Sequence, residues 1–275
     1  MSNDRNWTGE RLETFITNET MLEHLHRYAI TMQLVKGKKV LDIACGEGYG
    51  TNLLAKSATH VTGIDIDTTT IEKARKKYNA PNLSFESGSL LQIPAKAESY
   101  DIVTCFETLE HVSDHPLAFT ELKRVMVPGG ILIISTPEKA EYSDKVGYKN
   151  PFHQKELYGN EFKELVKRFF KFTFFCKQNC FAASLIQYEL SHEVKIFFTG
   201  SYEHIEPAPF AEPLYWIALA SDNELQTPDS SIFLQQKNIS QLLYDHTEAI
   251  KKTITYRIGN SILSPFKFIR SLLRK

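Results

Sequence analysis

The chain has 275 residues, of which 42% are hydrophobic and 24% charged, and its 32 basic residues nearly balance its 33 acidic ones. This length and composition suit one α/β domain with appendages, and the net charge of −1 offers no basic field for nucleic acid, which excludes DNA as a partner. No stretch approaches the roughly 18 apolar residues that cross a membrane, and residues 1–7 carry no apolar signal core.

Strand and helix signals alternate along the chain, which predicts a mostly parallel sheet with helices on both faces. We expect a helical lid at 1–35, a core domain at 36–220 with a substrate lobe inserted at 181–213, and a linker with a C-terminal helix at 221–275. Predicted strands in the core lie at 38–43, 60–65, 83–90, 99–106, 131–136, 171–176 and 214–220, and predicted helices at 69–78, 116–127 and 161–169. The second of these helices has Ser113 or Asp114 as its expected N-cap and Pro128-Gly129-Gly130 as its expected stop.

The first predicted strand runs into a glycine turn that carries acid on both sides. Gly46, Gly48 and Gly50 let a ligand approach the backbone, as in turns that bind a dinucleotide pyrophosphate. However, Asp42 ends the strand and Glu47 lies inside the turn. A carboxylate about 4 Å from a phosphate costs roughly 1 to 4 kcal/mol. The turn therefore favours a nucleotide-like ligand that carries a sulfonium or ammonium.

The second predicted strand ends in Asp65, at about the 20-residue spacing of a ribose-binding acid. The pattern Asp-x-x-x-Gly-x-Gly-x-Gly, followed by a strand ending Gly-Ile-Asp, resembles the class I S-adenosylmethionine (SAM) methyltransferases over roughly 36–220. The resemblance implies a Rossmann-like, doubly wound, mostly parallel seven-stranded α/β sheet with an antiparallel last strand. It also implies SAM as the cofactor. The alternative is a Rossmann-like domain that binds NAD or no ligand.

The resemblance implies a cofactor site spread over several segments of the chain. Asp42 would face the SAM ammonium, Asp65 the ribose, and Arg27 the carboxylate with Tyr28 packed nearby. The alternative for Arg27 is a solvated charge on a surface helix. The other expected cofactor residues, lying along the methionine, ribose or adenine, are Ala44, Gly46, Gly48, Ile66, Ser89, Leu90 and Phe106. Ser89 stands where many relatives have an acid, and Phe106 has an alternative role as a core aromatic.

Candidates for the acceptor chemistry follow the fourth predicted strand, in Phe106-Glu-Thr-Leu-Glu-His-Val112. A hydroxyl acceptor needs a base or a metal, because its pKa lies far above neutrality. Glu107, Glu110 and His111 resemble the metal-binding motif of ubiquinone-pathway and small-RNA O-methyltransferases, and His153 follows the fifth strand. These four side chains suit magnesium, manganese or zinc, which would grip a sugar diol. Two alternatives stay open. In the first, His111 or His153 acts as a plain general base with Glu107 beside it; in the second, these residues have structural roles only.

The C-terminal segment 251–275 contains seven basic residues and no acid. Its end, 264–275, predicts a basic amphipathic helix that would lie on an anionic membrane or dock on a partner protein, on its own domain or on a second subunit of a homodimer. The four cysteines lack the spacing of a zinc site, so we expect them to be reduced packing residues in a cytoplasmic protein; they are Cys45, Cys105, Cys176 and Cys180. The C-terminal helix would bring this protein to the periphery of a membrane.

Together these features predict a SAM-dependent methyltransferase that O-methylates a sugar or glycan intermediate, because its lid resembles those of enzymes from polysaccharide biosynthesis clusters. The alternatives are an RNA 2′-O-methyltransferase, a quinone-type small-molecule O- or N-methyltransferase, and a SAM-binding regulator without turnover.

Overall fold

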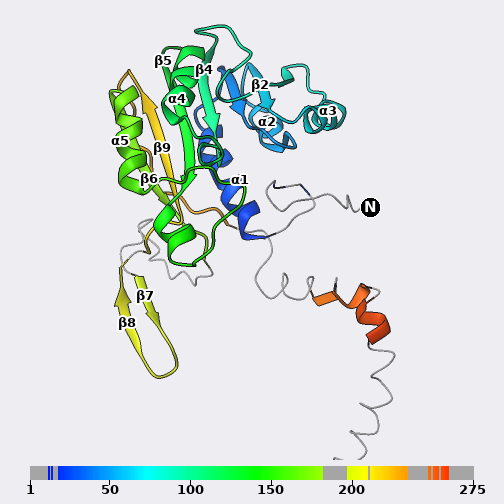
Figure 1. The fold of residues 1–275 in the computed structure, drawn as a ribbon, viewed down its shortest axis with the longest axis vertical. Coiled ribbons are helices and arrows are strands. Elements are labelled where there is room, and N and C mark those ends of the chain that lie inside the picture. The colour runs from blue at the N-terminus through cyan, green and yellow to red at the C-terminus, as the bar shows by residue number, and fades with distance from the viewer. Residues whose placement is uncertain are drawn as a thin grey trace, which may run out of the picture. The chain divides into compact units, whose positions relative to one another are not determined.

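The computed structural model describes residues 12, 14, 18–181, 197–209, 211–234, 247–248, 250–253 and 255–259. The chain divides into two compact units, 1–181 with 185–232 and 182–184 with 233–275 (Figure 1). In the second unit, residues 250–252 and 255–259 are helical, and the helix expected at 264–275 lies outside the described residues.

A seven-stranded sheet forms the centre of the first unit, in the order β3-β2-β1-β4-β5-β9-β6 (Figure 1). Only β9 is antiparallel to its neighbours, β5 and β6, which confirms the predicted mostly parallel α/β sheet with an antiparallel last strand. The strand order reverses between β1 and β4, so their carboxyl ends open the crevice where such sheets bind ligands. The strands are β1 Lys39–Ile43, β2 His60–Asp65, β3 Leu83–Ser87, β4 Tyr100–Cys105, β5 Met126–Pro137, β6 Phe172–Gln178 and β9 Tyr215–Ser221.

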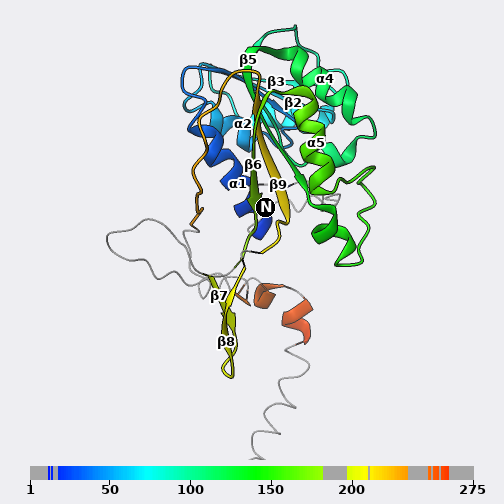
Figure 2. The ribbon, with the colours of Figure 1, turned by 90° about the vertical axis from the view of Figure 1, so that its left-hand side faces the viewer.

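Helices cover both faces of this sheet, with α1 and α2 on one face and α4 and α5 on the other (Figure 2). Each face buries its own apolar layer, with Phe119 and Phe162 fully buried beneath α4 and α5, and Leu54 and Val40 on the side of α1 and α2. The helices are α1 Glu19–Met32, α2 Tyr49–Leu54, α3 Thr68–Lys77, α4 His115–Val125 and α5 Gly159–Phe169.

The end of α4 differs from the sequence-based expectation. Asp114 caps its start as predicted, because its side chain accepts the Leu117 N–H at 2.9 Å. The helix ends at Val125, however, and β5 begins at once and includes Pro128-Gly129-Gly130. Gly129 has φ +73°, and the β4–β5 register shifts here, so this segment is an irregularity within the strand and not a helix stop.

The segment expected as a substrate lobe is described only in part. Its residues 182–196 and 210 lie outside the described set, and β7 Phe197–Gly200 pairs with β8 Ile205–Ala208 as a separate antiparallel hairpin. Every helix among the described residues is too short or too polar to cross a bilayer. All four cysteines are free thiols.

Helix α1 docks on the core through Tyr28, which is 5% exposed. Its ring makes edge contacts with Tyr49 and Phe106, at centroid distances of 5.7 and 5.3 Å. A Cβ atom on Gly50 would lie 1.8 Å from Cζ of Tyr28. Gly50, expected from sequence to let a ligand approach, thus makes room for this ring.

Replacing Gly50 with alanine tests this docking. Alanine favours a helix over glycine by about 1 kcal/mol. We nevertheless expect Gly50→Ala to lower the free energy of unfolding, measured in urea, by about 1 to 3 kcal/mol, because overpacking displaces the Tyr28 ring. In a Tyr28→Ala background the same change should no longer destabilise. A single variant as stable as the wild type would contradict the docking account.

Candidate active site

The glycine turn after β1 is held in place by Asp65 at the end of β2. Its Oδ2 accepts the Gly46 N–H and its Oδ1 accepts the Asp67 N–H, both at 2.9 Å. Ala44, Gly46 and Gly48 have positive φ of 58°, 53° and 83°, which turns the backbone sharply at the carboxyl edge of the sheet. Both carboxylate oxygens of Asp65 thus hold backbone N–H groups at this edge.

Asp42 lies inside the protein and is 1% exposed. Its carboxylate accepts hydrogen bonds from the hydroxyls of Thr51 and Thr104, each at 2.7 Å, and from Tyr28 at 3.2 Å. Burial raises the pKa of Asp42 to about 6, and these three hydroxyls oppose the shift. Hydroxyl groups of α2, β4 and α1 thus contact the carboxylate that we expect to face an ammonium, and that role stays a prediction.

Glu47, the other acid of the turn, is also paired. Its carboxylate lies 2.5 Å from Nζ of Lys77 and accepts the Thr14 N–H at 2.7 Å. The turn therefore presents less uncompensated negative charge to a ligand than the sequence indicates, and Asp65 is the acid that directly shapes it.

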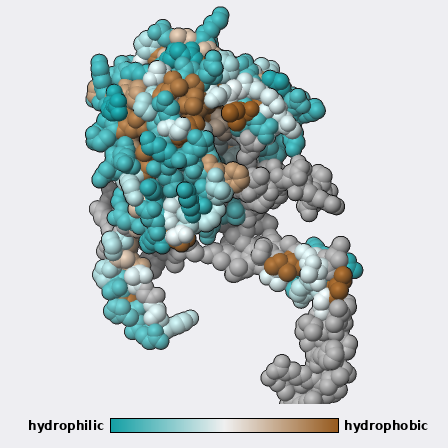
Figure 3. Space-filling model, in the orientation of Figure 1, coloured by the Kyte–Doolittle hydropathy of each residue, from teal (hydrophilic) through white to brown (hydrophobic). Residues whose placement is uncertain are grey.

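Hydrophilic residues dominate the face of the first unit in Figure 3, and hydrophobic ones gather there in small groups.

The residues expected beside adenine follow β2 and β3. Ile66 is 72% exposed directly after Asp65, whereas Leu90 is buried at 5%. The Ser89 hydroxyl accepts the Leu91 N–H at 3.1 Å, so it orders this loop.

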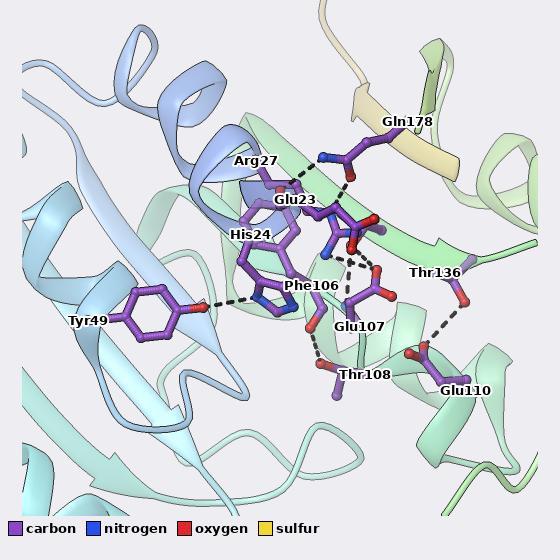
Figure 4. Close-up of polar contacts among 11 residues, drawn as sticks. Glu23, His24, Arg27, Tyr49, Phe106, Glu107, Thr108, Glu110, Thr136 and Gln178 are labelled. Carbon is purple, nitrogen blue, oxygen red and sulfur yellow. Dashed lines mark hydrogen bonds and ion pairs between the residues drawn. The ribbon is translucent and has the colours of Figure 1, made fainter. Parts of the chain in front are cut away.

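Arg27 is fully buried, which excludes the alternative of a solvated surface charge. Its Nε donates to Oε1 of Gln178 at 2.7 Å, its Nη1 lies 3.3 Å from Oε1 of Glu107, and its guanidinium lies 4.5 Å from the Tyr215 ring centroid (Figure 4). Its Nη2 has no hydrogen-bond partner among the described residues. A buried guanidinium with such an unsatisfied N–H group is suited to an anionic group of a ligand.

Sequence reasoning missed the partners of Arg27. Gln178 lies at the end of β6 and also donates to the Glu23 carbonyl at 2.9 Å, and Tyr215 begins β9 in register with Gln178. Glu23, one turn before Arg27 on α1, is 5% exposed. Burial raises the pKa of Glu23 to about 7, and the charge of Arg27 only partly offsets this. The sequence motif Glu23-His-Leu-His-Arg27 marks the helix, but its partners emerge only from the sheet order.

Glu107 and Glu110 point to different partners (Figure 4). Glu107 has φ +48°, and its carboxylate accepts the Ser135 hydroxyl at 2.6 Å in addition to the contact with Arg27. Glu110 is 2% exposed and accepts the Thr136 hydroxyl at 3.3 Å. Burial, reinforced by the charge of Glu107, raises the pKa of Glu110 well above its ordinary value.

The two histidines expected at the acceptor side lie together, with ring centroids 5.0 Å apart. Nδ1 of His111 lies 3.0 Å from the Phe152 carbonyl, which can only accept, so Nδ1 carries a proton and the neutral ring has its lone pair on Nε2. His153 has Nδ1 2.5 Å from Oε1 of Glu156 and Nε2 3.1 Å from Nδ2 of Asn150. Glu156 and Asn150, which orient His153, were not expected from sequence.

Three of the four expected metal ligands form a compact group. Ligand atoms of Glu110, His111 and His153 lie within 4.8 Å of one another. Both imidazoles direct Nδ1 at an oxygen, as metal-bound histidines commonly do. Glu107 lies outside this group because Arg27 and Ser135 hold its carboxylate. The donor set of one carboxylate and two imidazoles fits a divalent ion, although the amide of Asn150 contacts Nε2 of His153.

Comparison with known proteins agrees with this geometry. Residues 41–134 match the model of a methyltransferase domain family. Over these residues the chain is similar to methyltransferase domains. The match covers β1 to β5, and thus includes the glycine turn, Asp65 and the segment from Phe106 to His111.

Relatives and solved structures resemble more of the chain. A protein of Mycolicibacterium smegmatis named a probable S-adenosylmethionine-dependent methyltransferase is 34% identical over 163 residues, 58% of this chain and 63% of the relative. A ubiquinone biosynthesis O-methyltransferase of Actinobacillus pleuropneumoniae is 36% identical over 107 residues, 36% of this chain and 46% of the relative. The Haloferax volcanii protein solved in complex with the Trm112 methyltransferase activator shares the fold, with a TM-score of 0.54 at 18% identity over 75% of this chain and 91% of that one. The chain thus spans less than two thirds of the length of the Mycolicibacterium and Actinobacillus relatives.

The titration of Glu23 predicts a pH-dependent stability. Between pH 4.5 and about 7 the unfolded chain releases the Glu23 proton while the native protein keeps it, so the free energy of unfolding falls as pH rises. The difference in free energy of unfolding between Glu23→Gln and the wild type should therefore increase in favour of the variant from pH 4.5 to 7, and it should stay constant above pH 7. Urea unfolding at pH 4.5, 6, 7 and 8 measures this.

Glu19→Gln, at an exposed position on the same helix, is the matched control. Because the charge of Glu19 is the weakest of the causes that raise the pKa of Glu23, this variant should change the pH dependence far less than Glu23→Gln does. A Glu23→Gln curve that is parallel to the wild type would show that Glu23 does not retain its proton in the native state.

Proposed function

We propose that the protein transfers the methyl group of SAM to a hydroxyl of a sugar or glycan intermediate. The observation that carries the hydroxyl assignment is the His111 imidazole, whose Nδ1 is committed to the Phe152 carbonyl next to Glu110 and His153. We assign the role of general base to Nε2 of this imidazole, because His111 follows the carboxyl end of β4, where open α/β sheets bind their ligands. An amine acceptor would need no such base.

For SAM, we propose that Asp65 binds the ribose and that the unsatisfied Nη2 of Arg27 binds the methionine carboxylate. Asp42 acts through Tyr28 and Thr51, fixing the helices that flank the cofactor. The remaining contacts are assigned to Ala44, Gly46, Gly48 and Phe106 along the methionine and ribose, and to Ile66, Ser89 and Leu90 at adenine.

Methyl transfer from a sulfonium is an in-line displacement, and the protein mainly aligns donor and acceptor. The electron pair of the broken carbon–sulfur bond would stay on sulfur, which becomes a neutral thioether, and a lone pair of the acceptor oxygen would form the new carbon–oxygen bond. Nε2 of His111 takes the hydroxyl proton as this bond forms, and the Phe152 carbonyl stabilises the imidazolium through Nδ1. Glu156 orients the neighbouring His153 through its own Nδ1.

A divalent cation such as magnesium or manganese is a second candidate for activating the hydroxyl. Glu110, His111 and His153 would hold it, and a bound cation would supply Lewis acidity that lowers the hydroxyl pKa. Such an ion would also hold Glu110 in its ionised form, which burial otherwise disfavours.

Other acceptors and settings follow from specific observations. The likeness to the ubiquinone biosynthesis O-methyltransferase favours a quinone-type phenol as the second candidate substrate. An RNA 2′-O-methyl acceptor is disfavoured by the net charge of −1, and a non-catalytic SAM-binding regulator would leave the ordered His111 and His153 without a role.

We place the protein in the cytoplasm, where the helix predicted at 264–275 would contact an anionic membrane, a partner protein or a second subunit.

His111→Ala tests the chemistry. With radiolabelled SAM and fractionated lysate as the acceptor source, the variant should lose at least about 100-fold in methyl transfer, because it lacks the base. Its affinity for S-adenosylhomocysteine (SAH), measured by calorimetry, should equal that of the wild type. His204→Ala, at a histidine whose side chain is 71% exposed on the β7–β8 hairpin, is the control and should transfer normally.

Equal turnover by His111→Ala would dismiss the role of His111. Repeating the assay with a chelator and then with added magnesium or manganese separates the two activation modes, since indifference to both treatments would reject the metal. Label that enters RNA or a quinone in place of a saccharide fraction would overturn the proposed acceptor.

A further inference from the structure

A cavity adjoins His153 of the histidine pair. Its volume is about 610 Å³, and residues between 139 and 156 line it. Cavities of roughly 300 to 1,000 Å³ bind small molecules. His153 forms part of its wall, so a molecule held here would lie next to the proposed catalytic groups.

The lining contains three lysines, Lys139, Lys149 and Lys155, and two acids, so it has one more cationic residue than anionic ones. Neither Lys149 nor Lys155 has a carboxylate within ion-pair distance in the described part of the chain. Both acids of the lining already accept hydrogen bonds. Asp144 accepts the Tyr158 hydroxyl at 2.9 Å, and Glu156 accepts the Ser143 hydroxyl at 2.8 Å besides its contact with His153.

The backbone of this wall is irregular as well. Residues Ala140–Asp144 form a π-helical turn directly after β5, and Gly147 follows with φ +67°. Single π-helical turns occur frequently at functional sites. Ser143 and Asp144 of this turn line the cavity, and the ammonium of Lys139, the residue before the turn, lies 4.7 Å from the centroid of the Tyr158 ring.

We propose that this cavity binds a phosphoryl group of the acceptor, so that the substrate is a small phosphorylated molecule such as a sugar phosphate or a sugar nucleotide. The inference rests on the proposed function and refines its substrate class. Lysine ammonium groups bind phosphate as point charges, whereas planar carboxylates are matched better by arginine, which the lining lacks. The balanced charge of the whole chain favours a small molecule over RNA.

Inorganic pyrophosphate is the probe for this site. We expect the full chain to bind it, as followed by calorimetry at low ionic strength, and expect Lys149→Gln combined with Lys155→Gln to weaken binding at least about tenfold, because two charges are lost. Lys145→Gln is the matched control, since Lys145 is in the same loop but pairs with Glu141 at 2.6 Å and does not line the cavity. The control should bind pyrophosphate like the wild type.

SAH is titrated into the same samples and should bind all three proteins equally. Absence of pyrophosphate binding by the wild type, or an equal loss in Lys145→Gln, would overturn the phosphate site while leaving the SAM site intact. Failure to bind SAH with retained, lysine-dependent pyrophosphate binding would instead refute the proposed function. A short RNA that competes far more strongly than pyrophosphate, with a steep salt dependence, would overturn the small-molecule assignment.

Discussion

The buried carboxylate of Asp42 is the constraint on which the site depends. It receives hydroxyl hydrogen bonds from α1, α2 and β4 at the point where the strand order reverses. A buried charge is tolerated only when such donors satisfy it, so these contacts must form together. Through Tyr28 the network fixes α1, and α1 carries Arg27 into the interior beside Glu107. Asp42, which we expected from sequence to face the cofactor, thus helps to fix the positions of α1 and of Arg27.

From this centre a continuous series of polar groups leads toward the acceptor side. Arg27 contacts Glu107, Glu107 contacts Ser135 on β5, and Glu110 lies against Thr136, the next residue of that strand. Beyond Glu110 come His111 and His153, and then the lysine-lined cavity. The site therefore extends from a single buried cation, through two carboxylates in different environments, to two imidazoles whose tautomers are set by neighbouring oxygens. Such a progression suits a cofactor with a carboxylate at one end and an acceptor with an ionisable hydroxyl at the other.

Local patterns predicted the fold well, because the strands are buried apolar runs and Asp65 lies at a fixed spacing from the glycine turn. Caps were also predictable, as Asp114 shows. Long-range contacts were not. Arg27 and Gln178 are 151 residues apart, and nothing in either segment indicates that they meet. The role of Gly50 depends on a ring from α1, and the segment after α4 enters β5 because Gly129 permits an irregular strand. The acidity expected of the glycine turn was overestimated, since Lys77 and buried hydroxyls compensate Glu47 and Asp42.

The central claim is that Asp65 and the glycine turn bind a nucleoside with a sulfonium or thioether, and not an anionic dinucleotide. Calorimetric titration of SAH and of NAD into the wild type and Asp65→Ala tests it most directly. The account predicts that the wild type binds SAH and gives no heat with NAD, and that Asp65→Ala loses SAH affinity at least about tenfold, since both the ribose acceptor and the support of the Gly46 N–H disappear. Binding of NAD in place of SAH by the wild type, or unchanged SAH affinity in Asp65→Ala, would contradict it.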